Sequence, residues 1–150
     1  MAKKTRPGRL RIVAGKWRSR LLDIAAVDGL RPTAERIRET LFNWLAPTIA
    51  GSRCLDLCAG TGALGFEALS RGAESVVFVE KSPIAARTLR KNAEQLDAAG
   101  ADREAGRVRA SPDAADRVAL GLGEIVKQGG VNTSIVLFLK QFHFHSILGT

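Results

Sequence analysis

LDLCAGTGALGFEAL, residues 55–69, is the stretch that decides the fold of this 150-residue chain. Its apolar start predicts the end of a buried strand, and the glycines at 60, 62 and 65 lead into a helix. Glycine lets the backbone turn sharply and lets a ligand approach closely, and the helix start offers unpaired amide groups. Open parallel sheets bind ligands at the carboxyl ends of their strands. We therefore predict a cofactor site at this loop.

Two classes of cofactor compete for such a loop. GTGALG, residues 60–65, satisfies the dinucleotide pattern G-x-G-x-x-G, which alone is a weak signal. Asp56 discriminates, because its carboxylate would repel a pyrophosphate and would favour the ammonium and sulfonium groups of S-adenosylmethionine. Glu80 follows the next apolar run and can accept both hydrogen bonds of a ribose diol. The sequence favours S-adenosylmethionine, while a turn-capping Asp56 with a surface Glu80 stays an alternative.

The sequence on either side alternates between predicted strands and helices. Strands are predicted at 53–57, 75–80, 107–110 and 134–139. One helix is predicted from the glycine loop to Arg71, and two more at 83–100 and 113–122. Ser82 is the expected cap of the second helix. Strands separated by helices predict an α/β, Rossmann-like sheet of about four parallel strands.

The N-terminal third holds the entire charge excess of +8. Residues 1–53 contain twelve Lys and Arg against four Asp and Glu, whereas residues 54–150 contain eleven of each. Residues 9–22, RLRIVAGKWRSRLL, predict a β-hairpin that carries cations. These cations are Arg9, Arg11, Lys16, Arg18 and Arg20. The asymmetry favours a nucleic-acid partner over a solvated basic tail.

A helix is predicted between the hairpin and the first strand of the sheet. Thr33 is its expected N-cap and Pro47 its expected end. Apolar residues recur at helical spacing at Ile37, Leu41, Trp44 and Leu45. We divide the chain into residues 1–50, a basic arm with hairpin and helix, and residues 51–150, the cofactor-binding part.

Other partners and locations are disfavoured by the composition. No apolar run reaches the ~18 residues that span a bilayer, and no secretory signal follows the basic start. We expect a soluble cytoplasmic protein with no membrane partner. Cys54 and Cys58 fit no common zinc pattern with His143 and His145. We therefore expect no metal site, and buried or partly buried thiols.

Three runs resemble the bacterial 16S rRNA guanine-N2 methyltransferases, a class I, S-adenosylmethionine-dependent family. They are RIVAGKWRSRLL, LRPTAERIRETLFNWL and LDLCAGTGALGFEALSRGA, and the resemblance covers residues 9–97. The run at 31–45 is specific to that family. The resemblance implies that Asp56, Gly60 and Gly62 contact the methionine end of the cofactor and that Glu80 holds its ribose. Asp113, or Ser111, would reach the adenine, and the basic arm would bind 16S rRNA in the small ribosomal subunit.

The chain departs from this family after about residue 117. The family carries an Asp/Asn-Pro-Pro-Tyr/Phe motif after its fourth strand, whereas residues 140–143 here are Lys-Gln-Phe-His. We interpret the chain as truncated, frameshifted or a divergent paralogue, and expect methyl transfer at or near background. A non-catalytic RNA-binding remnant and a nicotinamide-dependent oxidoreductase are the alternatives.

Overall fold

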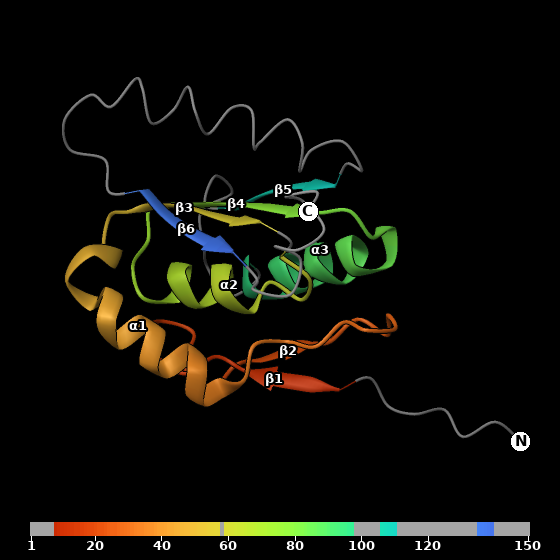
Figure 1. The fold of residues 1–150 in the computed structure, drawn as a ribbon, viewed down its shortest axis with the longest axis horizontal. Helices are drawn as coiled ribbons and strands as arrows, with labels where there is room; N and C mark the ends of the chain where they lie inside the picture. Colours follow the sequence, from red (N-terminus) through yellow and green to blue (C-terminus); the bar gives the residue numbers. More distant parts are fainter. Residues whose placement is uncertain (1–7, 58, 98–105, 111–134, 140–150) are drawn as a thin grey trace, which may run out of the picture.

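The described part of the chain forms a parallel sheet with helices on one face and a separate small hairpin (Figure 1). This computed structural model describes residues 8–57, 59–97, 106–110 and 135–139. Its sheet has the order β5 (Gly106–Ala110), β4 (Ser75–Glu80), β3 (Arg53–Leu57) and β6 (Ile135–Leu139). All three pairings are parallel. The predicted α/β class and the four parallel strands are confirmed.

The strand order places a switch point at β3. From β3 the chain adds β4 and then β5 on one side, and it later returns to pair β6 with the other side of β3. Asp56 lies opposite Phe78 of β4 and Phe138 of β6 in this register. Crevices at such switch points are where open α/β sheets bind ligands. The topology therefore puts the predicted loop at the most favourable edge of the sheet.

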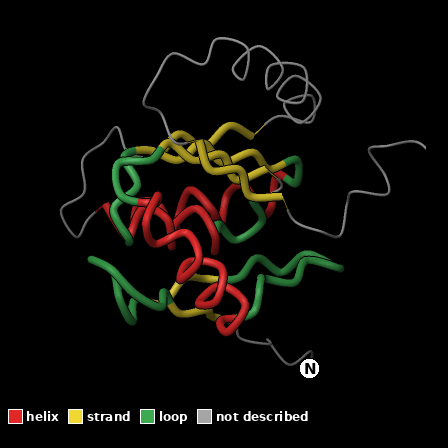
Figure 2. The backbone as a smooth tube through the Cα atoms, turned by 60° about the vertical axis from the view of Figure 1, so that its left-hand side comes forward, coloured by secondary structure: helices red, strands yellow, loops and turns green. Residues whose placement is uncertain are grey.

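Two helices and the hairpin form successive layers below the sheet (Figure 2). Helix α2 (Ala63–Ser70) and helix α3 (Pro83–Asp97) cover the sheet, and beyond them lie β1 (Arg9–Arg11), β2 (Leu21–Asp23) and α1 (Glu35–Ile49). One apolar cluster runs through all layers, from Leu22 of the hairpin to Phe78 of the sheet. Phe78 contacts Phe66 of α2, with ring centroids 4.7 Å apart. None of the described helices combines the length and apolarity that a membrane span needs.

Helix α3 follows the sequence prediction closely. Ser82 caps it, because the amide of Ala85 donates to the Ser82 hydroxyl at 3.3 Å. Its inward face is fully buried and consists of Ala85, Leu89, Asn92 and Leu96. This buried face consists of apolar residues at helical spacing together with the polar Asn92.

The ends predicted for α1 are wrong. Ala34, not Thr33, occupies the N-cap position, without a side-chain cap. The carbonyl of Thr33 instead accepts the Arg38 Nε–H at 3.1 Å. Pro47 lies inside the helix, which continues to Ile49. A proline removes one backbone hydrogen bond from a helix. The helix tolerates this loss because Pro47 lies in its last turn, two residues before its end at Ile49.

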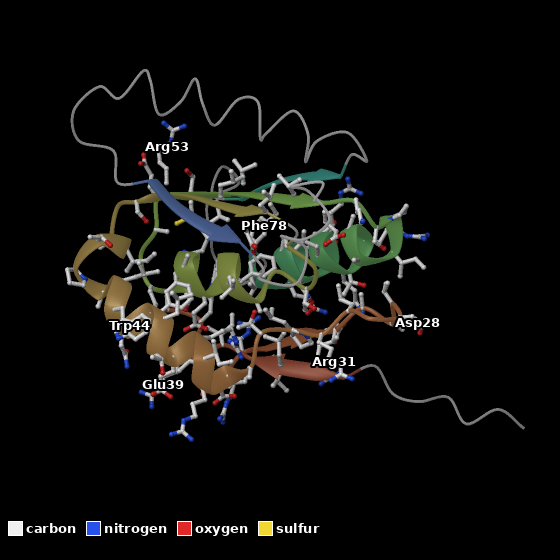
Figure 3. All side chains as sticks on the ribbon, in the orientation of Figure 1. Asp28, Arg31, Glu39, Trp44, Arg53 and Phe78 are labelled. Carbon is white, nitrogen blue, oxygen red and sulfur yellow. The ribbon has the colours of Figure 1, made fainter. Side chains whose placement is uncertain are left out.

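Of the four apolar residues at helical spacing in α1, Leu41 and Leu45 pack against the core, whereas Ile37 and Trp44 do not. Ile37 and Trp44 are 60% and 77% exposed, and Trp44 lies on the outer side of the helix (Figure 3). The buried positions are Arg38, Phe42 and Ile49. The spacing of apolar residues could not predict that Arg38 is buried. Arg38 occupies a core position because it forms an ion pair with a carboxylate of α2.

Candidate functional site

The glycine loop, residues 59–62, connects β3 to α2 and needs its glycines. Gly60 and Gly62 have φ values of 58° and 86°, in the left-handed region. Gly62 is also the N-cap of α2. A Cβ at Gly62 would overlap the side chains of Leu89 and Phe66. Both backbone conformation and space therefore require glycine at this position.

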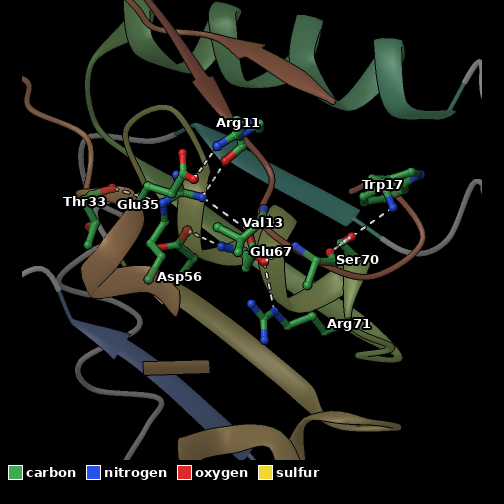
Figure 4. Close-up of polar contacts among 12 residues, drawn as sticks. Arg11, Val13, Trp17, Thr33, Glu35, Asp56, Glu67, Ser70 and Arg71 are labelled. Atoms are coloured by element: carbon green, nitrogen blue, oxygen red, sulfur yellow. Dashed lines mark hydrogen bonds and ion pairs between the residues drawn. The ribbon is translucent and has the colours of Figure 1, made fainter. Parts of the chain in front are cut away.

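Asp56 is buried at the base of this loop. Its side chain is 1% exposed, and Oδ2 accepts the amide N–H of Gly65 in the first turn of α2 at 3.0 Å (Figure 4). A carboxylate there interacts favourably with the positive end of the helix dipole. The alternative in which Asp56 acts as a cap is therefore correct in one respect, because Asp56 accepts a hydrogen bond from the first turn of α2. The same contact fixes the Asp56 carboxylate beneath the glycine loop.

Glu80 ties the glycine loop to the start of α3. Its Oε2 accepts the N–H of Gly60 at 2.6 Å, and its Oε1 accepts the N–H of Ser82 at 2.9 Å. Glu80 is 7% exposed, so the surface alternative is wrong. A carboxylate offers about four acceptor positions. Two backbone amides therefore leave capacity for two further donors, as a ribose diol would supply.

Asn92 links the glycine loop to the hairpin, and the sequence analysis missed this role. The buried amide accepts the N–H of Asp23 at 3.0 Å and donates to the carbonyls of Asp23 and Thr61, at 2.9 and 3.3 Å. One side chain therefore fixes both β2 and the loop. A polar residue on the apolar face of α3 was the available signal.

The loop also contains a buried hydroxyl. Thr61 is fully buried, and its Oγ1 has no hydrogen-bond partner within residues 8–57, 59–97, 106–110 and 135–139. A buried polar group without a partner is costly. The loop thus lies between two buried carboxylates, Asp56 and Glu80, an acceptor set that is chemically compatible with the ammonium and ribose groups of S-adenosylmethionine.

A buried ionic network holds the hairpin against α2 (Figure 4). Glu67 is 0% exposed and accepts the N–H groups of Val13 and Ala14 at 3.0 and 3.1 Å. It also pairs with Arg38 at 3.3 Å and Arg71 at 2.9 Å. Burial lowers the pKa of the Arg38 guanidinium, and the Glu67 charge opposes that shift. This network was not predicted from the sequence, although an acidic residue within the apolar run GFEAL, residues 65–69, was a signal for it.

Ser70 completes the attachment of the loop between β1 and β2. Its hydroxyl donates to the Ala14 carbonyl at 2.6 Å and accepts the Trp17 N–H at 3.0 Å. Gly15 has φ 88°, and a Cβ there would overlap the Ser70 carbonyl. This close approach fixes the position of residues 12–20 on α2.

The five predicted RNA-binding cations all lie exposed on the hairpin and its loop. Arg9 lies 3.6 Å from Asp23, and Arg11 donates to Glu35 at 2.8 Å. That hydrogen bond lowers the pKa of the Glu35 carboxyl. Lys16 lies 4.3 Å over the Trp17 ring, and Arg20 donates to the Gln95 carbonyl at 3.1 Å. Arg18 is exposed beside them.

Several predicted residues lie outside the described part of the chain. They are Asp113, Ser111, Cys58, His143, His145 and residues 140–143. Cys54 is buried, and this burial raises the pKa of its thiol. Within the described residues, no three His, Cys, Asp or Glu side chains gather as a metal site would require.

Comparison with known proteins identifies relatives for most of the chain. A family model described as Conserved hypothetical protein 95 matches residues 10–119. Ribosomal RNA small subunit methyltransferase D from Haemophilus influenzae is 54% identical over 89 residues, covering 59% of this chain and 46% of that protein. The chain spans about half the length of the curated relatives it matches.

Solved structures extend the likeness to the fold. An Escherichia coli protein described as a candidate methyltransferase superposes with a TM-score of 0.60 at 49% identity, covering 69% of this chain and 54% of that one. A hypothetical protein from Thermus thermophilus gives a TM-score of 0.66 at 33% identity, covering 93% and 74%. The described sheet and helices therefore have the class I methyltransferase fold, as the sequence predicted.

Proposed function

The chain belongs to the family described as Conserved hypothetical protein 95, and from this premise we propose that it binds S-adenosylmethionine and ribosomal RNA. The reaction that these two binding steps serve is methylation of a guanine N2 in 16S rRNA of the small ribosomal subunit. One observation carries the proposal above the others. Asp56, the glycine loop and Glu80 meet at the switch point of the sheet, and a relative that is 54% identical is named as a small subunit rRNA methyltransferase.

Each part of the proposed cofactor meets suitable chemistry in this chain. Gly60 and Gly62 admit the methionine end closely, and Asp56 supplies the charge that favours its ammonium. Glu80 accepts from the ribose hydroxyls, and Asp113 is the proposed adenine contact. S-adenosylmethionine, when bound, supplies a methyl group on a sulfonium. The protein positions this cofactor and excludes water from the loop.

The charge at Asp56 argues against a nicotinamide cofactor. A dinucleotide would place a pyrophosphate against the loop that Asp56 underlies, and Asp56 is 1% exposed. Electrostatic repulsion grows as the effective dielectric constant falls. The oxidoreductase alternative is therefore disfavoured on the residues themselves.

Photochemical labelling tests the cofactor half of the proposal. We expect methyl-tritiated S-adenosylmethionine to label the purified chain under ultraviolet light, and S-adenosylhomocysteine to displace it. Glu80→Gln should weaken labelling because it removes the charged acceptor, whereas Glu74→Gln, at an exposed position, should not. Labelling that NAD displaces as well as S-adenosylhomocysteine does would contradict the proposal.

The RNA half rests on the exposed cations of the hairpin. Neutralising phosphates releases counterions, so affinity should fall steeply with salt. Ile12 and Trp17 are buried, so single substitutions are safer tests than deletion of the arm. Arg18→Gln should weaken binding to 16S rRNA and reduce the salt slope by ~1. An unchanged slope for each single substitution of the five cations would contradict this half.

Methyl transfer itself is expected at or near background. Residues 140–143, Lys-Gln-Phe-His, lack the Asp/Asn-Pro-Pro-Tyr/Phe motif that the resemblance places after the fourth strand, and misplacing the guanine amine by about 1 Å can reduce the rate ~100-fold. The rate of methyl transfer is measured as tritium incorporated from labelled S-adenosylmethionine into the rRNA of undermethylated small ribosomal subunits. Incorporation well above a no-enzyme control would show that other residues orient the amine.

A further inference from the structure

A groove of about 410 Å³ lies between the hairpin and the segment that leads into α1. Its apolar wall includes Leu21, Ile24 and Pro32, and its polar members include Arg9, Arg11 and Glu35. Leu21 is 49% exposed, so the wall offers an apolar contact surface to a ligand. The function derived above, cofactor binding at the glycine loop, makes no use of this groove.

The arginines beside the groove are accessible to a ligand. The side chains of Arg9 and Arg11 are 63% and 55% exposed. They occupy alternate positions on β1, so they project from the same face about 7 Å apart. Arg11 uses one of its donors on Glu35, and a guanidinium has five. The longer contact of Arg9, 3.6 Å to Asp23, is a surface pair of the kind that contributes little.

We propose that this groove receives one unstacked base of a single-stranded RNA segment, with Arg9 and Arg11 contacting the phosphates on either side of it. An apolar wall bordered by guanidinium groups offers both the packing that a base needs and the charge that its backbone needs. The groove lies within the third of the chain that carries the net charge of +8. That charge favours a polyanion over a neutral or basic partner.

This proposal rests on the proposed binding of ribosomal RNA and gives that binding a location. It separates two contributions to affinity. The arginines contribute through phosphate contacts, which depend on salt and not on the presence of bases. Leu21 contributes through packing against a base, which is lost when the base is absent.

Fluorescence anisotropy with two RNA probes tests this separation. One probe is a labelled single-stranded RNA of about 12 nucleotides, and the other is an abasic ribose-phosphate chain of the same length. Leu21→Ala should weaken binding to the first probe by roughly five- to tenfold, because it removes apolar packing area. It should leave both the salt slope and the abasic affinity unchanged. Leu21→Phe should retain binding, because a ring can stack on the base.

Ile84→Ala is the matched control, since Ile84 is 50% exposed on α3 and lies outside the groove. It should leave both affinities unchanged. Arg9→Gln should weaken binding to both probes and reduce the salt slope by ~1. Thermal melting of each variant verifies that it remains folded.

Each remaining outcome would overturn the assignment. Equal effects of Leu21→Ala on the two probes, or no effect on either, would show that no base packs in the groove. Competition by polyglutamate as effective as competition by RNA would assign the groove to acidic peptides. If the wild-type chain binds neither these probes nor 16S rRNA, the proposed RNA function fails together with the groove. Binding to 16S rRNA without binding to the base-containing probe, or binding to that probe without a Leu21 effect, removes the groove alone.

Discussion

The glycine loop and the N-terminal hairpin are held in place by different kinds of polar contact. In the loop, Asp56 and Glu80 bind amides that lie 9 and 20 residues away in sequence. In the hairpin, Glu67 and Asn92 provide the fixing contacts, over 53 to 69 residues. The loop is therefore assembled mainly by neighbouring strand and helix ends, whereas the hairpin takes its position from helices that belong to the cofactor-binding part.

The two helices that present the glycine loop, α2 and α3, are the same two that bind the hairpin. The cations on the hairpin are exposed, while the groups that orient it are buried. The proposed RNA surface is thus held by the same two helices as the proposed cofactor site. Breaking individual contacts in each region tests how far this attachment reaches.

The largest effect is expected at Glu67. Glu67→Ala leaves the buried Arg38 charge without its partner and removes the acceptor for two hairpin amides. Removing one member of a buried pair typically costs about 3–5 kcal/mol. Urea denaturation should show a correspondingly lower midpoint. Glu74→Ala, at an exposed position on the other side of the α2–β4 turn, should change stability by less than ~0.5 kcal/mol.

The next largest effects are expected at two glycines, one from each region. Gly62→Ala and Gly15→Ala both combine positive φ with overlap against packed atoms. Gly29→Ala is the matched control, because Gly29 has φ 77° with nothing within 4 Å of the added Cβ. The control should lose about 1–2 kcal/mol, and the other two should lose more. Equal losses for all three, measured by thermal unfolding, would mean that close packing at the loop and hairpin is unimportant.

Asn92→Ala should have a smaller and more local effect. It removes the bonds to Asp23 and Thr61, and leaving such groups unsatisfied costs about 1–3 kcal/mol. Amide hydrogen exchange should become faster at Asp23, and the overall free energy of unfolding should fall. Asn43→Ala, at an exposed position of α1, serves as the control. Unchanged exchange at Asp23 would indicate that β2 is held without Asn92.

The smallest effect is expected from Cys54, at the start of the strand before the loop. Burial raises its thiol pKa in the folded state, so the neutral thiol contributes stability that is fully present below its unfolded pKa of about 8.5. That contribution is lost as the pH rises through the folded pKa. The stability of the wild type relative to Cys54→Ala should therefore decline above about pH 8.5. A difference that stays constant between neutral and alkaline pH would contradict the assigned burial effect.

The sequence predicted the loop region better than the hairpin region, for a physical reason. Strand β3, the glycine turn and the α3 face follow from local patterns of apolar residues and glycine. The burial of Arg38 does not, because a charged side chain at a core position is stable only when another part of the fold supplies its partner. Ile37 and Trp44 share the helical apolar spacing of Leu41 and Leu45, yet both are exposed. The roles of Glu67 and Asn92 likewise depend on which segments the fold brings together.

The central claim is that the carboxylate of Asp56 selects a cofactor with a cationic amino-acid end over a dinucleotide. Asp56→Asn tests this claim, because the amide oxygen can still accept the Gly65 N–H while the charge is removed. Calorimetric titration of the wild type should give tighter binding of S-adenosylhomocysteine than of NAD. Asp56→Asn should weaken the binding of S-adenosylhomocysteine by roughly tenfold and should not weaken the binding of NAD. Tighter binding of NAD by the wild type, or identical S-adenosylhomocysteine affinity in the folded Asp56→Asn variant, would contradict the account.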